Sequence, residues 1–188
     1  MALIVAGAGA SEITPPAGVN PAGYSHREGP SEGVHDELLC RALLLEDGPT
    51  RLGLVALDLL GIDFEVDAVI REAARAARVP PDHVLINCRH THAGPATTKL
   101  EGLGVSDKEY VASLPERAAG TLVDATGRLG PASLRYAEAP ARVGVNRRTR
   151  VRPGDRDGVA VLADARFGLL QPMHVSRSDE GGLRHGGP

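Results

Sequence analysis

The chain has few aromatic side chains. They make up 3% of its 188 residues, and there is no Trp. A hydrophobic core must therefore be built mostly from Leu, Val, Ile and Ala. No run of residues approaches the roughly 20 apolar positions that span a bilayer, so no transmembrane segment is predicted. The apolar start MALIVAGAGASEITPP lacks the basic region of a signal peptide. We therefore expect a soluble, cytoplasmic protein.

The chain also has no excess of positive charge, few cysteines and no recognisable nucleophile motif. The formal net charge is −3, which gives no attraction for nucleic acid or an anionic membrane. The two cysteines, Cys40 and Cys88, form no CxxC pair and lie in apolar runs, which predicts buried, unreactive thiols. There is no GxSxG motif. The glycine run AGAGAS lacks a following Lys-Ser/Thr or helix, so nucleotide binding is not predicted.

Hydrophobic periodicity predicts one domain with a mixed sheet. The expected order is strand, strand pair, helix, strand, helix, strand, which indicates an α/β class, with α+β as the alternative. A first strand ends at Pro15-Pro16, and the loop over 17–33 is long enough to suggest function. The expected later elements are a hairpin of strands 35–46 and 51–60, a helix from the N-cap Asp63 to Pro80, a strand over 83–88, a helix over 106–130 that Pro115 kinks or restarts, and a strand over 132–144. We expect this domain to span 1–170 and the tail 171–188 to be disordered.

The stretch LINCRHTHAGPATT ends an apolar run with two histidines. Side chains alternate along an extended segment, so His90 and His92 are expected on one side of the strand end. Such a pair can present two imidazoles to one cation, and Gly94-Pro95 would turn the chain and leave room for a substrate. The alternative is an ordinary strand end with two polar residues.

Two weaker candidates have simpler explanations. His35 and Asp36 are neighbours, but on a strand they would face opposite sides, which favours a surface role. The segment GVNRRTRVR gathers four arginines that could bind an anion or polarise a carbonyl, although a solvated loop explains them better: Arg147, Arg148, Arg150 and Arg152.

Four segments in order resemble one enzyme family. They are ASEITPPAGVNPAGY, GVHDELLCRALLLEDGPTRLGLVALDLLGID, PPDHVLINCRHTHAGP and ARVGVNRR. In this order and spacing they resemble the N-terminal catalytic domain of the neutral/alkaline non-lysosomal ceramidases and their shorter bacterial relatives. The resemblance covers about residues 5–148.

This resemblance implies a zinc-dependent amidohydrolase that cleaves the N-acyl bond of ceramide, or of a related lipid, to a fatty acid and an amine such as sphingosine. It implies that His90 is a zinc ligand, that His92 is a catalytic residue beside the substrate amide, and that Arg147 holds the substrate. Zinc in such a site lowers the pKa of a bound water and polarises the amide carbonyl.

The chain also departs from the family pattern. In the family a second histidine ligand, glutamate and tyrosine ligands and a serine follow the matched region. Here RPGDRDG has no serine, and His174 stands in a different context. From Phe167 onward the sequence is typical of a shortened or frame-shifted gene, so we expect an incomplete zinc site. The alternatives are an enzyme, a truncated non-catalytic remnant or binding module, and a chain completed by an oligomer or a separately encoded C-terminal half.

Overall fold

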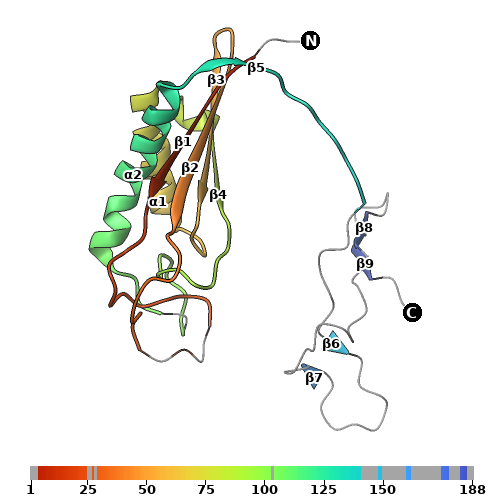
Figure 1. Ribbon diagram of the computed structural model, residues 1–188. Coiled ribbons are helices and arrows are strands. Elements are labelled where there is room, and N and C mark those ends of the chain that lie inside the picture. The colour runs from red at the N-terminus through yellow and green to blue at the C-terminus, as the bar shows by residue number, and fades with distance from the viewer. Residues whose placement is uncertain are drawn as a thin grey trace. The chain divides into compact units, whose positions relative to one another are not determined.

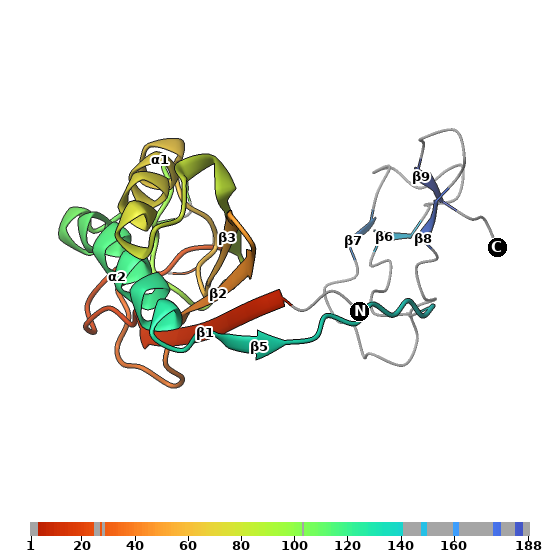
Figure 2. The same ribbon diagram turned by 90° about the horizontal axis from the view of Figure 1, so that it is seen from above.

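The architecture is a mixed five-stranded sheet with two helices on one face, seen in a computed structural model (Figures 1 and 2). The structure describes residues 4–24, 27, 29–102 and 104–140, and four short strands beyond them. The strand order is β4-β3-β2-β1-β5, antiparallel except for β3 beside β4. The strands are β1 Ile4–Glu12, β2 Leu39–Asp47, β3 Thr50–Leu57, β4 Val84–Cys88 and β5 Gly130–Ala132, and the helices are α1 Phe64–Ala73 and α2 Lys108–Thr126.

The expected element order and the α/β class are confirmed. Helix α1 begins directly after Asp63, as predicted, but the Asp63 side chain makes no capping bond. Its Oδ1 instead accepts from the amide of Lys99, 3.3 Å away. The helix ends at Ala73 and continues as short 3₁₀ turns, Ala74–Ala77 and Pro81–His83, into β4. Asp63 therefore links the start of α1 to the loop after β4.

Three expected boundaries were wrong. The first hairpin strand begins at Leu39 rather than residue 35, because the exposed polar residues before it pair with no neighbouring strand. Helix α2 is continuous through Pro115, so no new helix starts there. The last strand of the sheet is only Gly130–Ala132, and 133–140 form no strand; the rest of the strand expected over 132–144 lies outside the described residues.

The core lies between the sheet and the two helices. Alternate residues of β2 and β3 point into it, and Leu44, Val55 and Leu57 are fully buried there against Ile70 and Leu122 of the helices. The only aromatic side chain of this cluster is Tyr110, whose hydroxyl donates to the carbonyl of Ile13 at 2.6 Å. The core is aliphatic, as the composition predicts.

The glycines of AGAGAS let α2 lie directly on β1. A Cβ placed on Gly7 would lie 2.1 Å from the carbonyl oxygen of Ala125, and one on Gly9 would lie 2.5 Å from that of Thr121. No side chain fits in this contact. The glycine run therefore serves helix packing.

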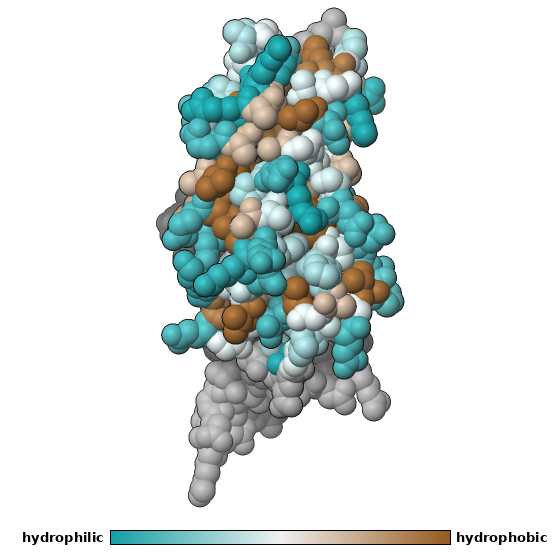
Figure 3. Space-filling view, turned by 90° about the vertical axis from the view of Figure 1, so that its left-hand side faces the viewer, coloured by the Kyte–Doolittle hydropathy of each residue, from teal (hydrophilic) through white to brown (hydrophobic). Residues whose placement is uncertain are grey.

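The two faces of the sheet differ. Within residues 4–134 both helices pack on one face (Figure 2). The opposite face carries leucines that remain partly exposed: Leu43 at 38%, Leu52 at 39% and Leu85 at 57%. On the helix side, by contrast, hydrophilic side chains cover most of the surface and hydrophobic ones gather in separate patches (Figure 3).

The chain divides into two compact units, Met1–Leu134 and Arg135–Pro188. In the second unit β6 (Arg148–Thr149) pairs with β7 (Ala160–Val161), and β8 (Val175–Arg177) pairs with β9 (Leu183–His185). The other residues after 140 lie outside the described ones, so the boundary at 170 and the disordered tail stay predictions. No helix in the described part of the chain has the length and apolarity needed to cross a membrane.

Candidate functional site

The two histidines lie at the carboxyl ends of the parallel strands β3 and β4. Ligand sites of sheets with parallel strands lie at this end, where the loops that follow the strands meet. Backbone bonds join the two loops, from the amide of Arg89 to Leu57 O at 2.9 Å and from the amide of His90 to Leu59 O at 3.0 Å. The loop after β1 lies at the same end of the sheet as the histidine loop after β4 (Figure 1).

The ring of His90 has a fixed orientation. Its Nδ1 lies 3.0 Å from the carbonyl oxygen of Leu60, a buried residue. Because a carbonyl oxygen only accepts, this contact requires the proton on Nδ1, and in the neutral imidazole Nε2 then keeps its lone pair. Metal-ligating histidines commonly donate their second nitrogen to a backbone carbonyl in this way. His90 is therefore prepared to bind a cation through Nε2.

His92 lies beside His90, but not for the reason that strand alternation gave. The ring centroids are 4.9 Å apart and the ring planes meet at 72°. However, β4 ends at Cys88 and His90 has a φ of 59°, so the segment is not extended. The left-handed turn at His90, rather than alternation along a strand, brings the two imidazoles together.

A second loop packs against His92. Ala22 N donates to Gly94 O at 2.9 Å and Ala96 N donates to Asn20 O at 2.8 Å, so the loop after β1 runs along the loop after β4. At Gly23 the backbone approaches so closely that a Cβ would lie 2.6 Å from Cγ of His92. The backbone at Gly23 therefore limits where the His92 ring can lie.

Tyr24 belongs to the same contact. Its ring lies edge-on to His92, with the centroids 5.2 Å apart, and the guanidinium of Arg27 lies 5.0 Å from the Tyr24 ring centroid. Sequence reasoning did not identify these residues individually. The only signals for them were the unusual length of the loop over 17–33 and the segment NPAGY in the family resemblance.

A groove of about 640 Å³ lies beside this loop pair. It is lined from the histidine loop by Thr91 and Gly94, and from the loop after β1 by Arg27, His35 and Asp36. His35 and Asp36 lie before β2, exposed, with Nδ1 and Oδ2 2.8 Å apart. The hydrogen bond to Asp36 raises the pKa of His35. The expected opposite orientation on a strand was wrong because no strand forms there.

The buried carboxylate of Asp58 supports the histidine loop through hydrogen bonds. Asp58 is 8% exposed and accepts from Leu39 N at 3.0 Å, from Arg41 at 3.0 Å and from Arg89 at 2.9 Å. Burial alone would raise the pKa of Asp58, but these hydrogen bonds and the nearby arginine charge outweigh it, and the pKa is lowered. Asp58 thus holds Arg89, the neighbour of His90, in place.

The described residues do not form a complete metal site by themselves. His90 is suited to be a ligand, but no three His, Cys, Asp or Glu side chains in the described part of the chain are placed to hold one metal ion. Zinc takes at least three protein ligands. Arg147 and His174 lie outside the described residues, so the structure does not place them.

The cysteines are not candidates for ligands or nucleophiles in their present surroundings. Cys40 is buried and Cys88 is partly buried, and neither forms a disulfide. Burial raises the pKa of both thiols, which disfavours the thiolate. The expectation of unreactive cysteines agrees with this.

Comparison with known proteins gives one consistent result. The solved structure of neutral ceramidase from Pseudomonas aeruginosa superposes with a TM-score of 0.57 at 25% identity, over 70% of this chain. The structure matches part of neutral ceramidase. A second solved structure, a ceramidase complexed with C2, matches the fold with a TM-score of 0.56 at 24% identity. The chain spans 22% of the length of each ceramidase chain. No protein-family model matches the sequence, and no curated protein matches it either.

Proposed function

We propose that this chain supplies part of the active site of a zinc-dependent hydrolase of N-acyl amides, with ceramide or a related lipid as the substrate. The observation that carries the proposal is the ring of His90, held through Nδ1 by Leu60 O with Nε2 free. It lies at the carboxyl ends of β3 and β4, in a fold that matches part of neutral ceramidase.

Each residue has a distinct role in this proposal. His90 binds zinc through Nε2. A bound zinc ion supplies Lewis acidity to a water and to the amide carbonyl. His92, with its ring 4.9 Å from that of His90, holds or moves a proton near the scissile amide. Arg147 donates hydrogen bonds to the polar part of the substrate. The groove beside Thr91 gives the head of the substrate a place to lie.

The test combines zinc titration by calorimetry with hydrolysis of a fluorogenic N-acyl amide. His90→Ala is expected to weaken zinc binding at least tenfold and to abolish zinc-dependent hydrolysis. His83→Ala is the matched control, because its Nδ1 also bonds to a backbone carbonyl, Arg51 O at 3.0 Å, but at the opposite end of β4. Equal behaviour of the two variants would refute the role of His90.

A second function, binding without turnover, has one observation in its favour. The described residues bring no third metal-ligating side chain to His90 and His92. A non-catalytic binding module of the same fold would bind the N-acyl lipid with or without zinc and would show no hydrolysis. Lipid binding by the unmodified protein, together with no turnover in the presence of zinc, would favour this function over catalysis.

A further inference from the structure

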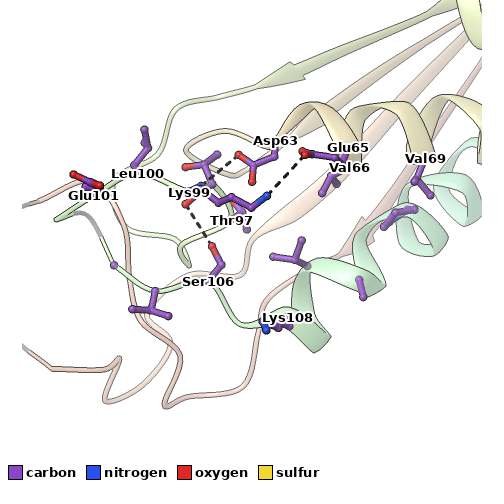
Figure 4. A pocket seen from close by; sticks show the side chains of 16 residues that line it. Asp63, Glu65, Val66, Val69, Thr97, Lys99, Leu100, Glu101, Ser106 and Lys108 are labelled. Atoms are coloured by element: carbon purple, nitrogen blue, oxygen red, sulfur yellow. Dashed lines mark hydrogen bonds and ion pairs between the residues drawn. The ribbon is translucent and has the colours of Figure 1, made fainter.

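A second groove, of about 860 Å³, lies between the amino-terminal halves of α1 and α2 and the loop after the histidines (Figure 4). Its helical walls are aliphatic: Val66 and Val69 from α1 face Val111, Ala112 and Pro115 from α2. Several of the apolar residues that line it are exposed to solvent, with Val69 at 53%, Leu100 at 46% and Val105 at 73%. Exposed apolar side chains that gather around one groove indicate a binding site.

The chemistry of the walls restricts the ligand. Among the described residues, the lining includes no aromatic ring to stack on a base or sugar and no arginine to bind a phosphate in a bidentate manner. The volume lies within the range of small-molecule sites. A groove of this size with valine, proline and leucine walls fits a flexible aliphatic chain.

The mouth of the groove carries both charge signs. Lys99 pairs with Glu65 at 3.8 Å, and its amide donates to Asp63. Glu101 and Lys108 also line the groove, and no ion pair involves either of them in the described part of the chain. A rim with near-balanced charge favours a neutral or zwitterionic head over a strongly charged one.

One backbone acceptor also lies on the wall. Pro115 has no amide hydrogen, so α2 lacks the hydrogen bond that this position would donate to the carbonyl of Val111. Both residues line the groove. This carbonyl is left without its usual helical donor and is suited to accept from a hydroxyl or amide of a ligand.

The groove and the histidine loop share one backbone segment. The carbonyl of Leu60 accepts from His90, and the carbonyl of the next residue, Gly61, accepts from Thr97, which lines the groove. Asp63, two residues further, also lines it. A molecule in the groove therefore lies against the same segment that fixes the His90 ring.

We propose that this groove binds the aliphatic chain of a single long-chain amphiphile with an uncharged or zwitterionic head. The proposal rests on the proposed function in that the amphiphile is the N-acyl lipid substrate. Because binding precedes any chemistry, it is measured separately from hydrolysis.

The experiment uses the full chain, which has no Trp of its own. Val105→Trp places a reporter at the groove, and Leu85→Trp places one on the opposite face of the sheet. The probe is an N-acyl amide brominated near the end of its alkyl chain, kept below its critical micelle concentration. Quenching is expected for the Val105→Trp protein and not for the Leu85→Trp protein, with at least tenfold tighter binding for a 16-carbon than for an eight-carbon chain.

A substitution that fills the groove tests where the probe binds. In the Val105→Trp background, Ala112→Phe is expected to weaken binding at least tenfold, whereas Val123→Phe, at an exposed position further along α2, changes it less than twofold. Adding His90→Ala leaves binding unchanged, so failure of catalysis does not count against the groove. Equal quenching of both reporters, no dependence on chain length, or displacement of the probe only by an amphipathic helical peptide would overturn the proposal.

Discussion

At the scale of single residues, the site depends on how the backbone constrains two imidazoles. His90 is fixed by a hydrogen bond to Leu60 O, and His92 is fixed by contact with the backbone at Gly23. The first constraint sets which ring nitrogen is free, and the second sets where the neighbouring ring lies. The second constraint is testable by a single substitution.

Gly23→Ala should displace His92. A Cβ at this position would lie 2.6 Å from His92 Cγ, and the φ of 101° is unfavourable for alanine. We expect a loss of about 2–4 kcal/mol in the free energy of unfolding, from strain and overpacking together. The loss is measured by denaturant unfolding, and the ring displacement by NMR of the histidine side chains.

Gly18→Ala is the matched control for this substitution. Gly18 has a similar φ of 99°, but a Cβ there would meet nothing within 4 Å. The strain alone should cost about 1 kcal/mol and leave the His92 signals in place. Equal losses in the two variants, with unchanged His92 signals, would show that Gly23 does not position the ring.

Asp58 predicts how stability depends on pH. Its pKa is lowered in the folded state, so it adds stability above the unfolded pKa of about 3.9, and this stability is lost as pH falls through the folded pKa. Asp58→Asn should therefore cost about 1–3 kcal/mol at pH 7, because two arginines lose their carboxylate. When unfolding is measured from pH 7 down to pH 3, the difference in the free energy of unfolding between the unmodified protein and Asp58→Asn should become smaller. A constant difference would contradict this.

At the scale of elements, close packing of α2 on β1 depends on glycines. Gly9→Ala would place a Cβ 2.5 Å from Thr121 O, so the helix must move, at a cost of about 1–3 kcal/mol. Gly120→Ala should change the free energy of unfolding in the opposite direction, because Gly120 lies inside α2 and a Cβ there meets nothing within 4 Å. It should stabilise the protein by about 0.5–1 kcal/mol. Thermal unfolding distinguishes the two, and a stabilising Gly9→Ala would contradict the packing account.

The order of elements could be predicted because the hydrophobic periodicity and the turn and capping residues indicate the same boundaries. The Asp47-Gly48 turn, Asp63 and Pro80-Pro81 mark boundaries that local chemistry determines. The start of β2 was harder to predict. Residues 35–38 run directly into β2, but they have no pairing partner because β1 ends at Glu12, opposite Leu39. Pro115 suggested a kink or a restart, and burial of Leu114 and Ala118 on the same helix excludes the restart and keeps α2 continuous.

The sequence indicated two candidate site residues, but not the geometry that brings their rings together. HTH marked the two histidines, but a left-handed residue such as His90 cannot be recognised from sequence unless it is glycine. Gly23 and Tyr24 were missed because they reach His92 across about 70 residues of sequence. Long-range packing of this kind leaves no periodic signal.

At the scale of the whole molecule, two grooves flank one histidine loop. One runs past Thr91 toward His35 and Asp36, and the other lies between α1 and α2. The segment from Leu60 to Asp63 accepts hydrogen bonds from both His90 and Thr97, and its Asp63 lines the second groove. The two proposals assign separate functions to this arrangement: chemistry at the histidine loop, and binding of an aliphatic chain in the second groove.

The central claim is that zinc binds to Nε2 of His90 while Nδ1 keeps its proton. NMR of the histidine ring nitrogens above pH 7.5, with and without one equivalent of zinc, tests it most directly, with signals assigned by the His90→Ala and His83→Ala variants. We predict that zinc shifts the Nε2 signal of His90, that Nδ1 remains protonated toward Leu60 O, and that His83 does not change. Unchanged His90 nitrogens in the presence of zinc, or loss of the Nδ1 proton, would contradict the claim.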